Sequence, residues 1–241
     1  AASKPFIFTV EGEPTEAMLQ VGHGFVERGL APMRTKGWEM IPLFQFVYHQ
    51  YAQGFCGENA GSWNTPDNFY YLSALTIVSG DMLMVNLSEE GKIAVQTHEI
   101  DDYDQTIESA WPPQQTEKYL RDLNRLRREC AREFLVLGRM ERPPEISCDV
   151  AAILEGENLH PWMADRQFKP TAASDFHLVV PAIVGSSWTS PEGRSGTVLV
   201  NHTTEARKAR VRIRGAVSPA VEVQWDSGRR DEARLDDGLF D

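Results

Sequence analysis

Continuous runs of apolar residues, with helical patterns between them, mark the first part of the chain. The apolar runs cover residues 5–10, 41–49 and 82–87 and have almost no polar side. Such runs are typical of strands that a parallel sheet buries on both faces. Apolar residues at helical spacing occupy 15–27 and 68–78. Strands that alternate with helices predict a parallel α/β arrangement.

The strongest helical pattern covers residues 116–137. Thr116 can cap its first turn and Gly138 can end it. From the adjacent pair at its start, its apolar residues recur at intervals of three and four, and they are Tyr119, Leu120, Leu123, Leu126, Cys130, Phe134 and Leu137. A Pro-Pro pair at 143–144 then breaks the pattern, and we expect a domain boundary between about residues 140 and 175.

Short β-runs separated by turn residues fill the rest of the chain. Two of them, 176–184 and 197–201, flank a turn at 190–196 that is rich in Gly, Ser and Pro. Short alternating strands of this kind are typical of an antiparallel sandwich. We therefore expect two domains, at 1–142 and 143–241.

Charge and composition exclude several classes of function. The chain has 35 acidic and 24 basic residues, a net charge of −11, and because nucleic-acid binding depends on clustered Lys and Arg we expect no nucleic-acid partner. Acidic residues interrupt the basic run at 121–132, as on a solvated face. No apolar stretch approaches the roughly 20 residues that span a bilayer. We expect a soluble protein with no membrane partner, and the sequence leaves its compartment open, secreted and periplasmic included.

Metal and cofactor motifs are not found in the sequence. The three cysteines are widely spaced, unlike those of a zinc site or a disulfide framework. Asp101, Asp102 and Asp104 lack the spacing of a calcium loop, and no phosphate-binding loop with its Lys is present. We expect no metal and no cofactor.

Two carboxylates, Glu11 and Glu13, follow the first predicted strand. In a parallel barrel the C-terminal strand ends face the substrate. Cleavage of a glycosidic bond needs one carboxylic acid to protonate the leaving oxygen and a second carboxylate to attack or to activate water. Glu11, aligned with the strand, is the candidate catalytic residue, and Glu13 is a candidate for substrate binding. The alternative is that Glu11 is a solvated charge and Glu13 caps the next helix.

Aromatic and polar residues elsewhere could bind a sugar. The further candidates for substrate binding are Tyr48, His49, Tyr51, Glu58, Trp63 and Asp81. Hydroxyl-bearing rings and imidazole can hydrogen-bond sugar hydroxyls at the end of the second predicted strand, and Trp63, in a long loop predicted at 52–67, offers a flat apolar surface. For the tyrosines the alternative is a place in the core, and for His49 it is a structural hydrogen bond, which is commoner for a lone histidine. Glu58 and Asp81 are weaker candidates because acidic residues are common in and beside loops.

Three segments of the chain, taken in order, carry a family resemblance. They are Phe8-Thr9-Val10-Glu11-Gly12, then 41–51 with its Pro-Leu-Phe and Val-Tyr-His sequences, then 187–201. In this order they resemble an uncharacterised family of glycoside-hydrolase-like barrel proteins. In that family a Glu-Gly pair after a late barrel strand and the Pro-Leu-Phe…Val-Tyr-His run on the next strand precede a terminal β-sandwich. The resemblance implies processing of a glycoside or polysaccharide, with Glu11 as an acid/base residue.

These observations combine into one predicted architecture and function. We expect an α/β fold that forms the C-terminal portion of a (β/α)8, TIM-like barrel and is followed by a small antiparallel β-sandwich. About three parallel strands cannot close a barrel of eight, so we expect the other strands and the partner carboxylate on a missing N-terminal portion or on another chain. The predicted function is that of a glycosidase portion with a carbohydrate substrate, and the alternative is a non-catalytic carbohydrate-binding or structural module. The prediction requires Glu11 and the group Tyr48 to Tyr51 to lie side by side at one edge of the sheet.

Overall fold

A computed structural model of the chain describes residues 9–11, 24–26, 42–56, 66–83, 113–148, 151–157, 175–213, 220–224, 229–234 and 239–240.

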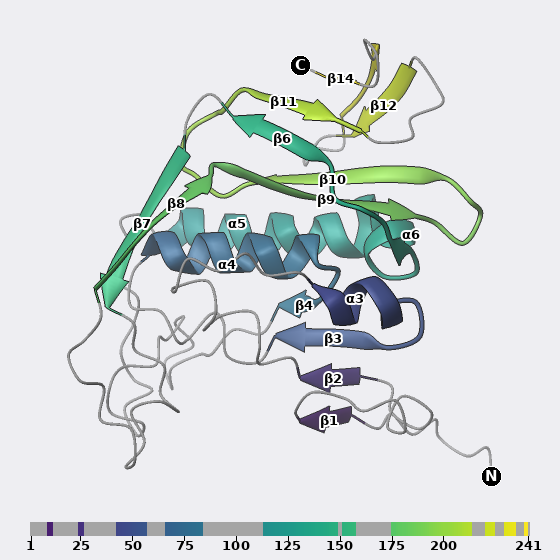
Figure 1. Ribbon diagram of the computed structural model, residues 1–241, viewed down its shortest axis with the longest axis horizontal. Helices are drawn as coiled ribbons and strands as arrows, with labels where there is room; N and C mark the ends of the chain where they lie inside the picture. Colours follow the sequence, from purple (N-terminus) through teal and green to yellow (C-terminus); the bar gives the residue numbers. More distant parts are fainter. Residues whose placement is uncertain are drawn as a thin grey trace.

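A parallel sheet of four strands forms the N-terminal part of the fold. Its strands are β1 (Thr9–Glu11), β2 (Gly24–Val26), β3 (Gln53–Cys56) and β4 (Met82–Leu83), in the order β1-β2-β3-β4. All pairs are parallel, and their arrows point the same way in Figure 1. This pairing agrees with the parallel arrangement predicted from the sequence. Four such strands do not close a barrel, and the barrel stays a prediction.

Two long helices pack side by side over this sheet. They are α4 (Pro66–Val78) and α5 (Pro113–Arg125), and Figure 1 shows them between the parallel sheet and the antiparallel strands. Residues 69–78 of α4 are all buried, as expected of a helix that is apolar on every side. A π-helical turn, η1 (Leu126–Cys130), and the short α6 (Arg132–Leu135) continue α5. The helices predicted at 68–78 and 116–137 are thus confirmed, the second with an interruption, but the predicted cap is wrong, because α5 begins at Pro113 and Thr116 lies inside it.

The segment predicted as the second strand is a helix. Residues 41–49 supply α3 (Leu43–Tyr48), and β3 begins only at Gln53, inside the predicted loop. An apolar run without polar alternation does not distinguish strand from helix. In α3 and the residue that follows it, the buried side chains are the polar Gln45 and His49, and the exposed ones are mainly apolar. The spacing of apolar residues therefore does not reveal the helical period. The helix predicted at 15–27 is also wrong over 24–26, which form β2.

Antiparallel strands form the rest of the fold. One sheet has the order β10-β9-β5 and another the order β14-β11-β6, beside the pairs β7–β8 and β12–β13. The bounds are β5 (Arg139–Met140), β6 (Glu145–Cys148), β7 (Ala151–Glu157), β8 (Asp175–Pro181), β9 (Ile183–Thr189), β10 (Ser195–Asn201), β11 (Ala209–Arg212), β12 (Ala220–Gln224), β13 (Arg230–Arg234) and β14 (Leu239–Phe240). Strands β5 to β7 lie at or beside the domain boundary that the sequence predicts between about residues 140 and 175. The turn predicted at 190–196 joins β9 to β10, and the Ser190 amide donates to the Arg194 carbonyl at 2.8 Å.

One hydrophobic core lies between the helices and strands β9 and β10. Trp188, 1% exposed, packs there with Leu72 of α4, Leu135 of α6 and Val198 of β10. The core therefore joins residues from both sides of the boundary predicted at 142–143. The division into two domains stays a prediction.

Candidate functional site

Glu11 is the last residue of β1, at the carboxyl edge of the parallel sheet. The register aligns it with Val26 of β2, and Val26 is aligned in turn with Phe55 of β3. In parallel α/β folds this edge is where substrates bind. The position agrees with the prediction, and the catalytic role of Glu11 stays a prediction. The other candidates Glu13, Glu58 and Trp63 lie outside the described residues.

Tyr48, His49 and Tyr51 lie at the opposite, amino edge of the sheet. They belong to the end of α3 and to the turn that enters β3 at Gln53, and Figure 1 shows α3 beside the start of the β3 arrow. The amides of Tyr51 and Ala52 close this turn by donating to the Tyr48 carbonyl at 2.8 and 3.1 Å. The expected cluster of Glu11 with these three residues is therefore wrong, because they precede strand β3 and do not end it.

The two tyrosines are placed differently from each other. Tyr51 is 71% exposed. Tyr48 is half-buried and packs on Phe44, with 5.4 Å between ring centroids. Tyr51 is therefore the more accessible of the two to an external ligand.

His49 is buried and joins three parts of the fold. Its Nδ1 lies 3.0 Å from the Gly138 carbonyl and its Nε2 lies 3.3 Å from the Gly80 carbonyl. Its ring meets Trp188 edge-on at 4.7 Å. A neutral imidazole carries a single proton and can donate to only one of the two carbonyls. This is the structural hydrogen-bonding role that the sequence left as the alternative.

Asp81 is fully buried at the amino end of β4. Its Oδ2 accepts a hydrogen bond of 2.8 Å from Gln45 Nε2 of α3. Gly54 of β3 lies so close that a Cβ on it would stand 2.1 Å from Asp81 Oδ1. The carboxylate is enclosed and connects α3 to the turn before β4, and its predicted substrate-binding role stays a prediction.

Arg127 of the π-helical turn was missed by the sequence analysis. Its Nε donates to the Gly80 carbonyl at 3.1 Å, and a terminal nitrogen donates to the Gln53 side-chain oxygen. Burial lowers the pKa of Arg127, the charge of Asp81 opposes this shift, and Arg128 lowers the pKa further. The sequence gives no signal for this role, because Arg127 stands in a run of mixed charge that is typical of a solvated helix face.

Together these side chains form an amino-edge cluster, which we define as Gln45, His49, Gln53, Asp81 and Arg127. Its members come from α3, the turns before β3 and β4, the first residue of β3, and the π-helical turn. In parallel barrels this face of the sheet stabilises the fold, while the carboxyl face carries the chemistry. The cluster therefore connects the helices to the sheet, and the candidate catalytic position remains that of Glu11.

The stability of the fold should depend on pH through His49. Burial lowers the pKa of His49 from its ordinary value of 6.5, hydrogen bonds to Gly138 and Gly80 oppose the shift, and Arg127 lowers the pKa further. The unfolded chain then binds a proton at a higher pH than the folded chain. Stability is full above about pH 6.5 and decreases as the pH falls, by up to about 1.4 kcal/mol per pH unit for one proton.

Urea unfolding of the wild type and of His49→Gln between about pH 7.5 and 5.5 checks this expectation. The stability advantage of the wild type should narrow as the pH falls, because glutamine does not titrate. A constant difference across that range would contradict a neutral, buried His49.

Among the described residues, no three His, Cys, Asp or Glu side chains gather as a metal site requires. Within the same part of the chain, no helix combines the length and apolar character needed to cross a membrane. Comparisons with protein family models, with curated proteins and with solved structures find no match to this chain.

Proposed function

We propose that the chain is part of a carbohydrate-active hydrolase in which Glu11 acts as the general acid/base. The observation that carries the proposal is the place of Glu11 at the end of the first strand of a parallel sheet. A carboxylate at this edge can reach a substrate that lies over the sheet. The order of the Glu-Gly pair, the Pro-Leu-Phe…Val-Tyr-His run and the later β-rich segment also supports it, by resemblance to glycoside-hydrolase-like barrel proteins.

The proposed reaction needs a second carboxylate. A partner at about 5–5.5 Å from Glu11 would act as the nucleophile of a retaining enzyme, and one at about 6.5–9.5 Å would activate water in an inverting enzyme. The four described strands are fewer than the eight of a complete barrel. We propose that the partner carboxylate lies on a strand from a further portion of the protein or from another chain.

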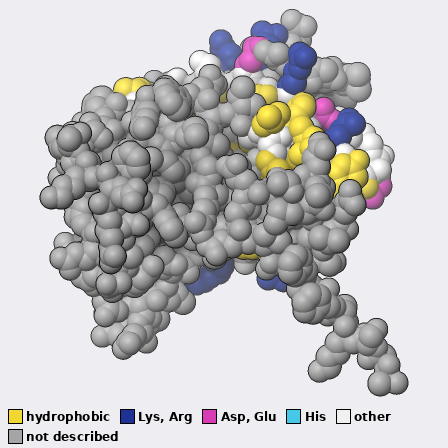
Figure 2. All heavy atoms as spheres, turned by 60° about the horizontal axis from the view of Figure 1, so that its bottom comes forward, with side chains coloured by type: hydrophobic (Ala, Val, Ile, Leu, Met, Phe, Trp, Pro, Cys, Tyr) yellow, Lys and Arg dark blue, Asp and Glu magenta, His cyan; other side chains and the backbone are white. Residues whose placement is uncertain are grey.

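The second candidate function is a non-catalytic carbohydrate-binding module, which one observation favours. Leu43 and Phe46 of α3 are 64% and 44% exposed, and Tyr51, in the turn that follows the helix, is 71% exposed. Figure 2 shows hydrophobic side chains of the described residues open to solvent on one face. Exposed aromatic rings offer a surface on which a sugar ring can stack. In this case Glu11 has only a structural role.

Substitution of Glu11 by glutamine should lower kcat/KM on glycosides by at least about a hundredfold, the usual contribution of a general acid or base. The loss should be largest for substrates with poor leaving groups, such as alkyl glycosides, and smallest for dinitrophenyl glycosides, whose leaving oxygen needs no proton. The assay uses the full protein together with any chain that completes the barrel.

Glu117→Gln is the matched control, because Glu117 is exposed on α5 and has only a long contact of 3.9 Å with Arg121. Its activity should equal that of the wild type. Equal activity of Glu11→Gln and the wild type would remove Glu11 from catalysis. Glycan binding without any hydrolysis would favour the binding module.

A further inference from the structure

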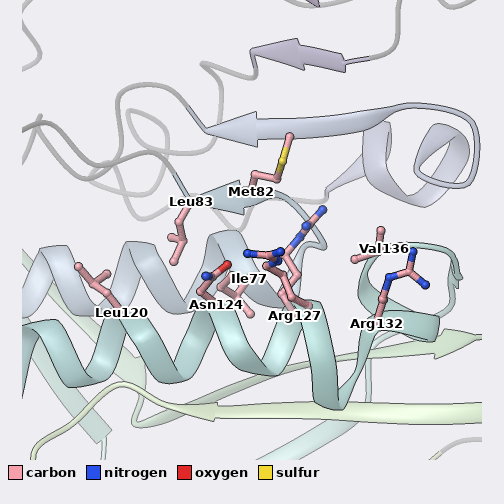
Figure 3. Close-up of a pocket in the computed structure, with 9 residues that line it drawn as sticks. Ile77, Met82, Leu83, Leu120, Asn124, Arg127, Arg132 and Val136 are labelled. Atoms are coloured by element: carbon pink, nitrogen blue, oxygen red, sulfur yellow. The ribbon is translucent and has the colours of Figure 1, made fainter. Parts of the chain in front are cut away.

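A cavity of about 620 Å³ lies between β4, the last of the described strands of the parallel sheet, and the helical segment formed by α5, η1 and α6. Figure 3 shows Met82 and Leu83 of β4 on one side of it and Leu120, Asn124 and Arg127 on the other. Pockets of about 300–1,000 Å³ hold small organic ligands. The cavity is therefore of the right size for a molecule with one ring.

Arginine side chains dominate the polar wall of this cavity. Arg127, Arg128 and Arg132 line it with Asn124, and no acidic side chain is among the described residues of its wall. Arg128 and Arg132 are exposed. Asn124, Arg128 and Arg132 all line the cavity, so they lie on the same side of the helical segment.

The π-helical turn contributes to this concentration of charge. The Ala131 amide donates to the Leu126 carbonyl at 2.8 Å, five residues back, so the turn holds one residue more than an α-helical turn. Arg127 is directed inward and donates hydrogen bonds to neutral oxygens. Burial lowers the pKa of Arg127 most, the charge of Asp81 raises it, and the like charge of the neighbouring Arg128 lowers it further. An anion between the guanidinium groups would offset this repulsion.

We propose that this cavity binds a small organic anion through its carboxylate or phosphate group. Arg128 and Arg132 donate to the oxyanion from their planar guanidinium groups, with Asn124 as a neutral donor, and Arg127 supplies fixed positive charge behind them. The apolar side chains of Ile77, Met82 and Leu83 contact the ring or chain of the ligand. The cavity borders β4, and Glu11 lies on β1 at the other side of the sheet, so this site is separate from the proposed catalytic one.

Calorimetric titration with phenyl phosphate tests the proposal, because this probe carries both an oxyanion and an apolar ring. Benzoate replaces the phosphate by a carboxylate, inorganic phosphate removes the ring, and benzyl alcohol removes the charge. We expect phenyl phosphate or benzoate to bind the wild type with a Kd below about 1 mM, inorganic phosphate to bind more weakly, and benzyl alcohol not to bind. The tighter of the two aromatic anions identifies the preferred oxyanion.

The variant R128Q/R132Q should weaken this binding at least tenfold. Its matched control is R121Q/R230Q, which removes the same charge from exposed residues that do not line the cavity. Equal weakening in both variants would reduce the effect to general charge attraction and overturn the proposal. The proposal would also be overturned if none of the anions bound at about 10 mM. Because binding is measured without any reaction, the result is independent of Glu11.

Discussion

Replacement of Trp188 by alanine should lower the free energy of unfolding by about 3–5 kcal/mol, the usual cost of removing a large buried aromatic side chain. Trp188 is 1% exposed, meets the His49 ring edge-on, and donates from Nε1 to Ser186 Oγ at 2.7 Å. Its removal leaves a cavity between α4 and strands β9 and β10 and an unfilled side of the His49 ring. Urea unfolding followed by circular dichroism measures the change.

Trp188→Phe is the conservative control for this experiment. It keeps a ring in the core and loses the hydrogen bond to Ser186, so we expect a cost of about 1–2 kcal/mol. A cost below about 1 kcal/mol for Trp188→Ala would contradict the place of this side chain at the centre of the core.

A methyl group added at Gly80 should destabilise the fold by about 3 kcal/mol, through backbone strain and collision together. Gly80 has φ +83°, where L-residues other than glycine are strained. Its added Cβ would stand 2.3 Å from His49 Nε2 and 2.8 Å from Trp188 Cη2. Both rings are held by other contacts and cannot move without loss. Unfolding of Gly80→Ala in urea gives the cost.

Gly193→Ala separates strain from collision. Gly193 has φ +82°, almost the same as Gly80, and a Cβ there would meet no atom within 4 Å. We expect a cost of about 1 kcal/mol, from strain alone. Similar costs for the two alanine variants would show that Gly80 is not packed against His49 and Trp188.

Elements with a clear local pattern could be predicted from the sequence. The spacing of apolar residues located α4 and α5, and the Ser-Pro-Glu-Gly turn located the hairpin of β9 and β10. These elements follow from side-chain periodicity and turn chemistry within a few neighbouring residues. The inward place of Arg127 could not be predicted, because its partners Gln53 and Gly80 lie far from it in sequence.

The candidate site was predicted less well, for a physical reason that concerns one segment. The run 41–49 is mostly apolar, yet the buried residues in its described part, 42–49, are the polar Gln45 and His49. Their burial is stabilised by Asp81, Gly80 and Gly138, all distant in sequence, and no local pattern contains that information. Because this segment is a helix that precedes β3, and not a strand, Tyr48, His49 and Tyr51 lie at the edge of the sheet opposite to Glu11. The position of Glu11 could be predicted correctly, because it depends only on where one strand ends.

The polar inward side of α3 determines when this helix can form. A helix of six residues is too short to persist alone in water, and its inward side chains bond to residues 36, 31 and 89 positions further along the chain. Because these partners follow α3 in the chain, we expect the helix to form only after they have been synthesised and packed around it.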